Sequence, residues 1–112
     1  MWVFIDPSTN TIECREDCSY EEIVSLVGGD LSNGCKVDHV TQDFSVIYNS
    51  TSDRERNLVI FGVESELCGG PSEGPAKHGP VAVVGSSTTL WNDYLPLTVE
   101  SADTIFQFAQ DA

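Results

Sequence analysis

Two short apolar runs, residues 58–63 and 81–84, constrain the fold most, because they flank a stretch rich in glycine and proline. Aliphatic, β-branched and aromatic side chains fill both runs with almost no polar interruption. A run of this length is too short for a typical helix and is typical of a strand that is buried on both faces. The sequence therefore predicts two central strands, joined by an exposed Gly/Pro-rich loop at residues 64–80.

Further strands are expected from short apolar or alternating segments. Residues 2–5 and 11–14 predict a strand pair around a turn cluster that contains Pro7. Residues 36–41 and 44–48 predict a hairpin. We expect irregular structure at residues 30–35, and no single long element at residues 86–97, where polar residues and a proline interrupt the apolar ones.

Two helices carry clear start signals. Ser19 and Glu22 match a capping box, and Gly28 with its following glycine is expected to end that helix. Thr98 is the expected N-cap of a helix over residues 99–110. The apolar positions of both helices and of the strands predict a core that contains Phe4, Ile23, Leu26, Ile60, Val81, Val83, Ile105 and Phe106.

These elements predict one α+β domain over residues 1–112. We expect a sheet that is mainly antiparallel or mixed, of about five or six strands, with two helices packed on it. The length of 112 residues suffices for one modest core, and the chain shows no internal repeat or interdomain linker.

The charge is strongly one-sided, since 18 Asp and Glu stand against 5 Lys and Arg for a net charge of −13. Direct binding of nucleic acid or of an anionic membrane surface requires basic side chains, so this composition excludes both. Two interpretations stay open. The acids serve solubility, or adaptation to a salty habitat, or they attract a basic partner.

Four cysteines stand at positions 14, 18, 35 and 68. The start of the chain lacks a basic region followed by a long apolar stretch, and no run reaches transmembrane length. We therefore expect a cytoplasmic protein with reduced thiols and no cofactor.

The order of the predicted elements resembles a family of small uncharacterised proteins from phages and plasmids, known only as a domain of unknown function. Residues 79–85 followed by Leu97 and Thr98 carry most of the resemblance, together with the helix that ends in two glycines and Asn57 before an apolar run. The inserted segment 64–78 and the cysteines depart from that pattern. The resemblance implies an accessory protein of a mobile element, and the family has no established activity to carry over to this chain.

Three features of the chain resemble a phosphate loop, a zinc site and a cysteine nucleophile with its base. Residues 69–74 resemble a phosphate loop but lack the lysine and hydroxyl that would follow. The cysteines, with His39 and His78, offer zinc ligands, although only Cys14 and Cys18 are closely spaced. Cys68 and His78 could act as nucleophile and base, but both fall in the predicted loop, so we expect no catalytic residues.

The expected function is therefore a non-enzymatic phage or plasmid accessory protein that binds a host protein with a basic surface. One form is an acidic inhibitor that mimics nucleic acid at a host defence or nucleic-acid enzyme. The alternatives are a module that binds a small ligand or zinc through the Gly/Pro loop, and a small enzyme centred on Cys68 and His78. The residues expected to contact the partner are Glu64, Glu66, Glu73, Lys77 and His78.

Overall fold

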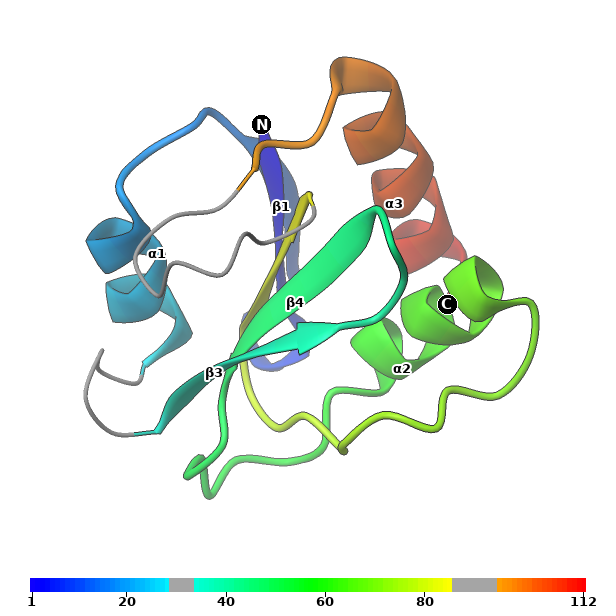
Figure 1. The fold of residues 1–112 in the computed structure, drawn as a ribbon. Helices are drawn as coiled ribbons and strands as arrows, with labels where there is room; N and C mark the ends of the chain where they lie inside the picture. The colour runs from blue at the N-terminus through cyan, green and yellow to red at the C-terminus, as the bar shows by residue number, and fades with distance from the viewer. Residues whose placement is uncertain (29–33, 86–94) are drawn as a thin grey trace.

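The structure is a computed structural model that describes residues 1–28, 34–85 and 95–112. Its elements are, in chain order, β1 (Trp2–Asp6), η1 (Pro7–Thr9), β2 (Thr11–Arg15), α1 (Tyr20–Val27), β3 (Cys35–His39), β4 (Phe44–Asn49), α2 (Leu58–Cys68), β5 (Val81–Gly85) and α3 (Val99–Asp111). The α+β prediction is confirmed, with three helices where the sequence predicted two (Figure 1).

The five strands form one sheet in the order β2-β1-β5-β4-β3, and each neighbouring pair is antiparallel. The register sets Val3 of β1 opposite Cys14 of β2 on one side and opposite Val83 of β5 on the other. The predicted strands β1, β2 and β5 and the predicted hairpin of β3 and β4 are thereby confirmed.

Helices cover both faces of the sheet, which explains the continuous apolar sequence of β1 and β5. Figure 1 shows α1 on one side of the sheet and α2 with α3 on the other. Along β1, Trp2 and Phe4 pack into the core under α1, whereas Val3 and Ile5 pack into the core under α2 and α3. All five residues of each strand are buried. Because side chains alternate across a strand, two cores require apolar residues at successive positions, here Trp2 to Ile5 of β1 and Val81 to Val84 of β5.

The helix α1 begins as predicted. The Ser19 side chain accepts a hydrogen bond from the amide of Glu22, and Gly28 ends the helix in a left-handed conformation at φ +97°. Its buried stripe is Tyr20, Ile23, Val24 and Val27. The prediction of Leu26 as a core residue is wrong, because Leu26 is 36% exposed on the outer face of the helix.

The prediction of a strand at residues 58–63 is wrong, since these residues form the first half of α2. Asn57 caps the helix, because its side-chain oxygen accepts a hydrogen bond from the amide of Ile60 at 3.0 Å. The helix then continues beyond Val63, and the buried positions Ile60, Val63 and Glu64 recur at helical spacing. The helical spacing is hard to recognise in the sequence, because one of the three buried positions, Glu64, is acidic.

The predicted loop over residues 64–80 is shorter than expected at both ends. Its first five residues belong to α2, which ends at Gly69 in a left-handed conformation. Several later residues are buried, among them Lys77, Gly79 and Pro80. The exposed part is the stretch from residue 69 to residue 76, which contains both exposed and half-buried positions.

The helix α3 begins at the predicted cap, where the hydroxyl of Thr98 accepts a hydrogen bond from the amide of Ser101. Ala102, Ile105 and Ala109 are buried, but Phe106 is only half-buried, so its assignment to the core is wrong. Most of the irregular segments predicted at residues 30–35 and 86–97 lie outside the described residues. Within the described ranges, no helix combines the length and apolar character needed to cross a membrane.

Candidate functional site

The structure divides the five predicted partner-contact residues into two groups. Glu66 and Glu73 are exposed, as expected. Glu64 and Lys77 are 3% and 2% exposed, so their assignment to a contact surface is wrong. His78 is half-buried, and its Nδ1 lies 2.9 Å from the carbonyl oxygen of Arg54.

The side chain of Lys77 is fully buried and lies between two carboxylates. Its Nζ donates to Oδ2 of Asp38 at 2.6 Å and to Oε2 of Glu64 at 2.8 Å. A further hydrogen bond reaches the carbonyl oxygen of Pro75 at 3.2 Å. The ring of Tyr48 lies beneath the ammonium, with its centroid 5.3 Å from Nζ. We call Lys77, Asp38 and Glu64 the buried triad.

Three separate parts of the chain supply the triad. Asp38 lies on the edge strand β3, Glu64 on the buried side of α2, and Lys77 in the segment that leads to β5. The backbone amide of Asn57 donates to the carbonyl of Lys77 at 2.8 Å, which fixes this segment beside the start of α2. Gly74 lies so close to Asp38 that a Cβ there would stand 2.7 Å from Oδ2. The absence of a side chain at Gly74 therefore permits the close approach.

Burial governs the electrostatics of the triad. Burial raises the pKa of the Glu64 carboxyl, the hydrogen bond and charge of Lys77 act in the opposite direction, and the charge of Asp38 raises it further. Removing ionised groups from water is costly unless attraction and hydrogen bonds compensate for it. Two carboxylates against one ammonium leave one negative charge in excess at this site.

A hollow of about 380 Å³ adjoins the triad at Asp38. Val40, Cys68, Ser72 and Glu73 also line it, so it opens between the edge of the sheet, the end of α2 and the glycine-rich segment. The triad is therefore buried on the protein side, while the Asp38 side chain, 20% exposed, has a route to solvent.

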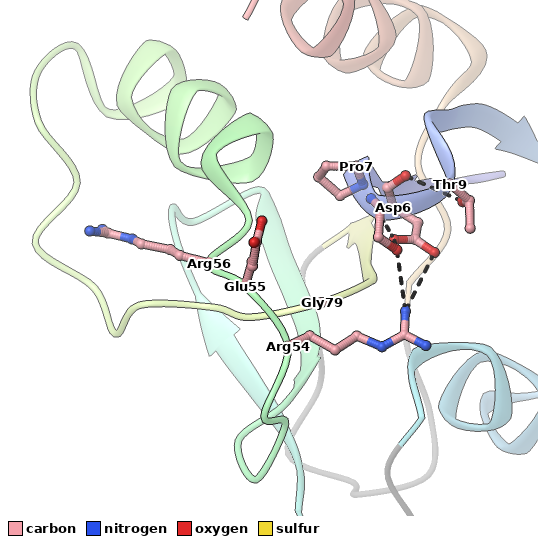
Figure 2. Close-up of a pocket in the computed structure, with 8 residues that line it drawn as sticks. Asp6, Pro7, Thr9, Arg54, Glu55, Arg56 and Gly79 are labelled. Atoms are coloured by element: carbon pink, nitrogen blue, oxygen red, sulfur yellow. Dashed lines mark hydrogen bonds and ion pairs between the residues drawn. The ribbon is translucent and has the colours of Figure 1, made fainter.

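A second hollow, of about 400 Å³, lies between η1 and the segment before α2 (Figure 2). The buried Asp6 accepts hydrogen bonds from the amide and hydroxyl of Ser8 through Oδ1, and Arg54 lies 3.9 Å from Oδ2. Arg56 points away from Asp6, and its guanidinium lies 4.8 Å from the ring centroid of Phe61. Both arginines are thus engaged by groups of the chain itself.

Within the part of the chain that it describes, the structure does not bring together the residues of the alternative sites, which are a Cys68–His78 pair and a zinc site. Cys68 Sγ lies 3.8 Å from the carbonyl oxygen of Val40, whereas His78 bonds to the backbone of Arg54. No disulfide joins any of the four cysteines, all of which are described. Among the residues that the structure describes, no group of three or more His, Cys, Asp or Glu side chains could hold a metal ion.

Folding leaves a markedly acidic surface. In the described ranges, twelve acidic residues are exposed against three basic ones, Lys36, Arg54 and Arg56. The exposed acids are Glu16, Asp17, Glu21, Glu22, Asp43, Asp53, Glu55, Glu66, Glu73, Glu100, Asp103 and Asp111. Lys77 is buried and does not contribute to the surface charge. Arg15 is half-buried, and its guanidinium forms an ion pair with Glu13 at 2.8 Å.

Three exposed acids, Asp17, Glu22 and Asp103, lie on segments that border the start of β1. The N-terminal amine bonds to Asp17 and to the carbonyl of Leu97, so the start of α3 lies beside the segment before α1. Burial raises the pKa of Cys14, and the charge of Asp103 adds to this effect. Burial likewise raises the pKa of Cys18, and Glu22 adds to it. We call Asp17, Glu22 and Asp103 the acidic end.

Comparison with known proteins yields no relative. No family model, no curated protein and no solved structure matches this chain. The site therefore has to be interpreted from its own chemistry.

Sequence reasoning missed the buried triad because it placed Glu64 and Lys77 in one exposed loop and connected neither of them with Asp38. In β3, Asp38 bonds to Lys77, whereas His39 Nδ1 lies 3.1 Å from the hydroxyl of Ser45. A usable signal was present, since Glu64 follows Ile60 by one helical turn.

Proposed function

We propose that this chain is a non-enzymatic binding protein that docks on a basic surface of another protein. The observation that carries the proposal is the excess of exposed acidic over exposed basic residues in the described ranges. Net charge of one sign raises the encounter rate with a surface of the opposite sign and suppresses association with acidic partners. The resemblance to phage and plasmid proteins makes a host protein the proposed partner, and a nucleic-acid enzyme presents a basic surface of the required kind.

Two surfaces can supply the contact. One is the pair Glu66 and Glu73, which remains from the set expected in the sequence. The other is the acidic end, whose three acids lie on segments that border the start of β1. Acids near helix starts also stabilise their own helices, so neutralising them affects stability as well as binding. The two surfaces therefore need separate variants.

The test begins with capture of a partner from a lysate of a candidate bacterial host at low salt. Association rates are then measured against salt for the wild type, for Glu66→Gln with Glu73→Gln, and for Asp17→Asn with Glu22→Gln and Asp103→Asn. We expect the rate to fall with salt, because exposed charges are screened beyond about 8 Å at physiological ionic strength. One of the two variants should associate more slowly, by on the order of tenfold.

The matched control for the pair variant is Asp43→Asn with Asp111→Asn, which removes the same charge from two other exposed positions. It should associate at nearly the wild-type rate. Rates that are independent of salt and equal in all variants would contradict the proposal and leave solubility as the role of the acids.

A further inference from the structure

The buried triad places a primary amine against a carboxyl group under conditions that differ from those of a surface ion pair. Nζ of Lys77 has no exposure to solvent and lies 2.6 Å from Oδ2 of Asp38. A second carboxyl, from Glu64, lies 2.8 Å from the same nitrogen. An amine, a carboxyl and a proton carrier are therefore in contact. Lys77 and Asp38 are 39 residues apart along the chain.

We propose that Lys77 and Asp38 are a site of covalent self-modification, in which an isopeptide bond forms between Nζ of Lys77 and Cγ of Asp38 with Glu64 as the proton carrier. The bond would join the edge strand β3 to the segment before β5. It is independent of the proposed partner binding.

The reaction balances without a further reactant. Glu64 takes one proton from the Lys77 ammonium and delivers it to an oxygen of Asp38, and the neutral amine then attacks Cγ. Glu64 takes a second proton from the nitrogen and delivers it to the leaving oxygen, so the C–O bond breaks and one water departs. The nitrogen keeps one proton as the amide N–H. No group is oxidised or reduced.

Position and burial favour this condensation over hydrolysis. Two groups held in reactive geometry behave as if at an effective concentration of about 10⁵–10⁸ M, which is far above that of the water in a buried site. The ionised triad carries an excess negative charge in a poorly solvated site, and condensation removes two of its three charges. Glu64 then takes a proton from solvent and remains as a neutral acid, which agrees with the upward shift of its pKa by burial.

Asp38 suits the role of electrophile better than Glu64. Asp38 lines the hollow of about 380 Å³, through which the released water can leave. Glu64 is more deeply buried, and both of its oxygens lie within hydrogen-bond distance of Nζ, at 3.2 and 2.8 Å. A carboxyl bound in this way is placed to exchange protons with the nitrogen.

The test is the intact mass of the purified full-length chain under denaturing conditions, with Lys77→Arg as the reference. We expect the wild type to lack the mass of one water, and Lys77→Arg to show its full sequence mass. Trypsin should then fail to cleave after Lys77, and residues 37–54 should remain attached to residues 57–112. A wild type of full sequence mass that is cleaved after Lys77 would overturn the proposal, as would a bond mapped to Glu64.

Two glutamate variants test the proton carrier. Glu64→Gln keeps the shape of the side chain and should abolish the loss of water, whereas Glu100→Gln, at an exposed position of α3, should leave it complete. Asp38→Ala should also abolish the loss of water. For Asp38→Ala and Lys77→Arg the result is the intact mass under denaturing conditions, so the measurement does not depend on the stability of the variant. Loss of water in Glu64→Gln equal to that in the wild type would refute the assigned role of Glu64.

Discussion

At the residue scale, the chain stabilises itself through a few polar side chains that are buried and fully bonded. Asn57 is 1% exposed, and its side-chain amide donates to the carbonyls of Ile5 and Gly79 while its oxygen caps α2. The buried triad is the charged counterpart. In the described residues, no buried side-chain nitrogen or oxygen lacks a hydrogen-bond partner. Buried polar groups that are satisfied in this way specify one arrangement of the chain, because any other arrangement leaves them unpaired.

Titration of Glu64 should make stability depend on pH. Its folded pKa is raised above the ordinary 4.5, mainly by burial and partly by Asp38, while Lys77 and Arg56 act against the shift. The native state therefore holds the proton more tightly than the unfolded state, so this contribution to stability is present below pH 4.5 and is lost as pH rises through the folded pKa. Urea unfolding from pH 4 upward should show a more negative slope of stability against pH for the wild type than for Glu64→Gln.

Glu66→Gln is the control for this titration, since Glu66 lies exposed on the same helix. Its slope should match that of the wild type. A Glu64→Gln slope equal to the wild-type slope would show that Glu64 titrates alike in the folded and unfolded chain.

At the element scale, local pattern and tertiary context agree for most segments and conflict in α2. Residues 58–63 have the composition of a buried strand, yet Asn57 fixes a helix start by bonding to β1 and to the segment before β5. Tertiary context of this kind overrides β propensity, which amounts to about 1 kcal/mol over the whole scale. The helix also packs against α3, which buries Ile60 and Val63 in the core, whereas Leu58 stays exposed.

Replacing Ile60 by Asp should unfold the domain, because Ile60 is 1% exposed and an unpaired buried charge costs several kcal/mol, about 3 or more. The matched control is Leu26→Asp, which introduces the same charge on an apolar helix position that is 36% exposed. Leu26→Asp should retain a cooperative thermal transition close to that of the wild type. Equal melting temperatures for the two variants would contradict the packing of α2 on the sheet.

At the scale of the whole molecule, three layers give a small chain two cores. The sheet supplies both inner surfaces, α1 closes one, and α2 with α3 closes the other. Charge repulsion opposes this compact arrangement. The net charge is −13, and few basic residues are exposed in the described ranges to offset it. Repulsion among charges of one sign destabilises a compact state.

Salt should therefore stabilise this protein. Raising NaCl from near zero to about 0.15 M shortens the screening length to about 8 Å, and we expect an increase in melting temperature of about 4 °C, equivalent to roughly 1 kcal/mol. Partly exposed ion pairs such as Arg15–Glu13 weaken with salt but contribute little. The variant Asp17→Asn with Glu22→Gln and Asp103→Asn should respond less, and a wild-type melting temperature that falls with salt would exclude dominant repulsion.

Features that depend on neighbours within a few residues can be predicted from the amino-acid sequence. The caps Ser19 and Thr98, the glycine at the end of α1 and the β3–β4 hairpin follow from local hydrogen bonding and from side-chain alternation. Composition likewise determined the acidity of the molecule. Such features can be predicted because each is stabilised by groups close to it in the chain.

The identity of α2 and the assembly of the buried triad depend instead on contacts between segments that are distant in the chain. Asn57 contacts Ile5 and Gly79, and Lys77 contacts Asp38 and Glu64, through separations of 13 to 52 residues that no local pattern encodes. A lysine in a glycine-rich segment has the same sequence signature whether it faces water or two buried carboxylates. What separates the two cases is desolvation, which exists only once β3, α2 and the segment before β5 have packed together.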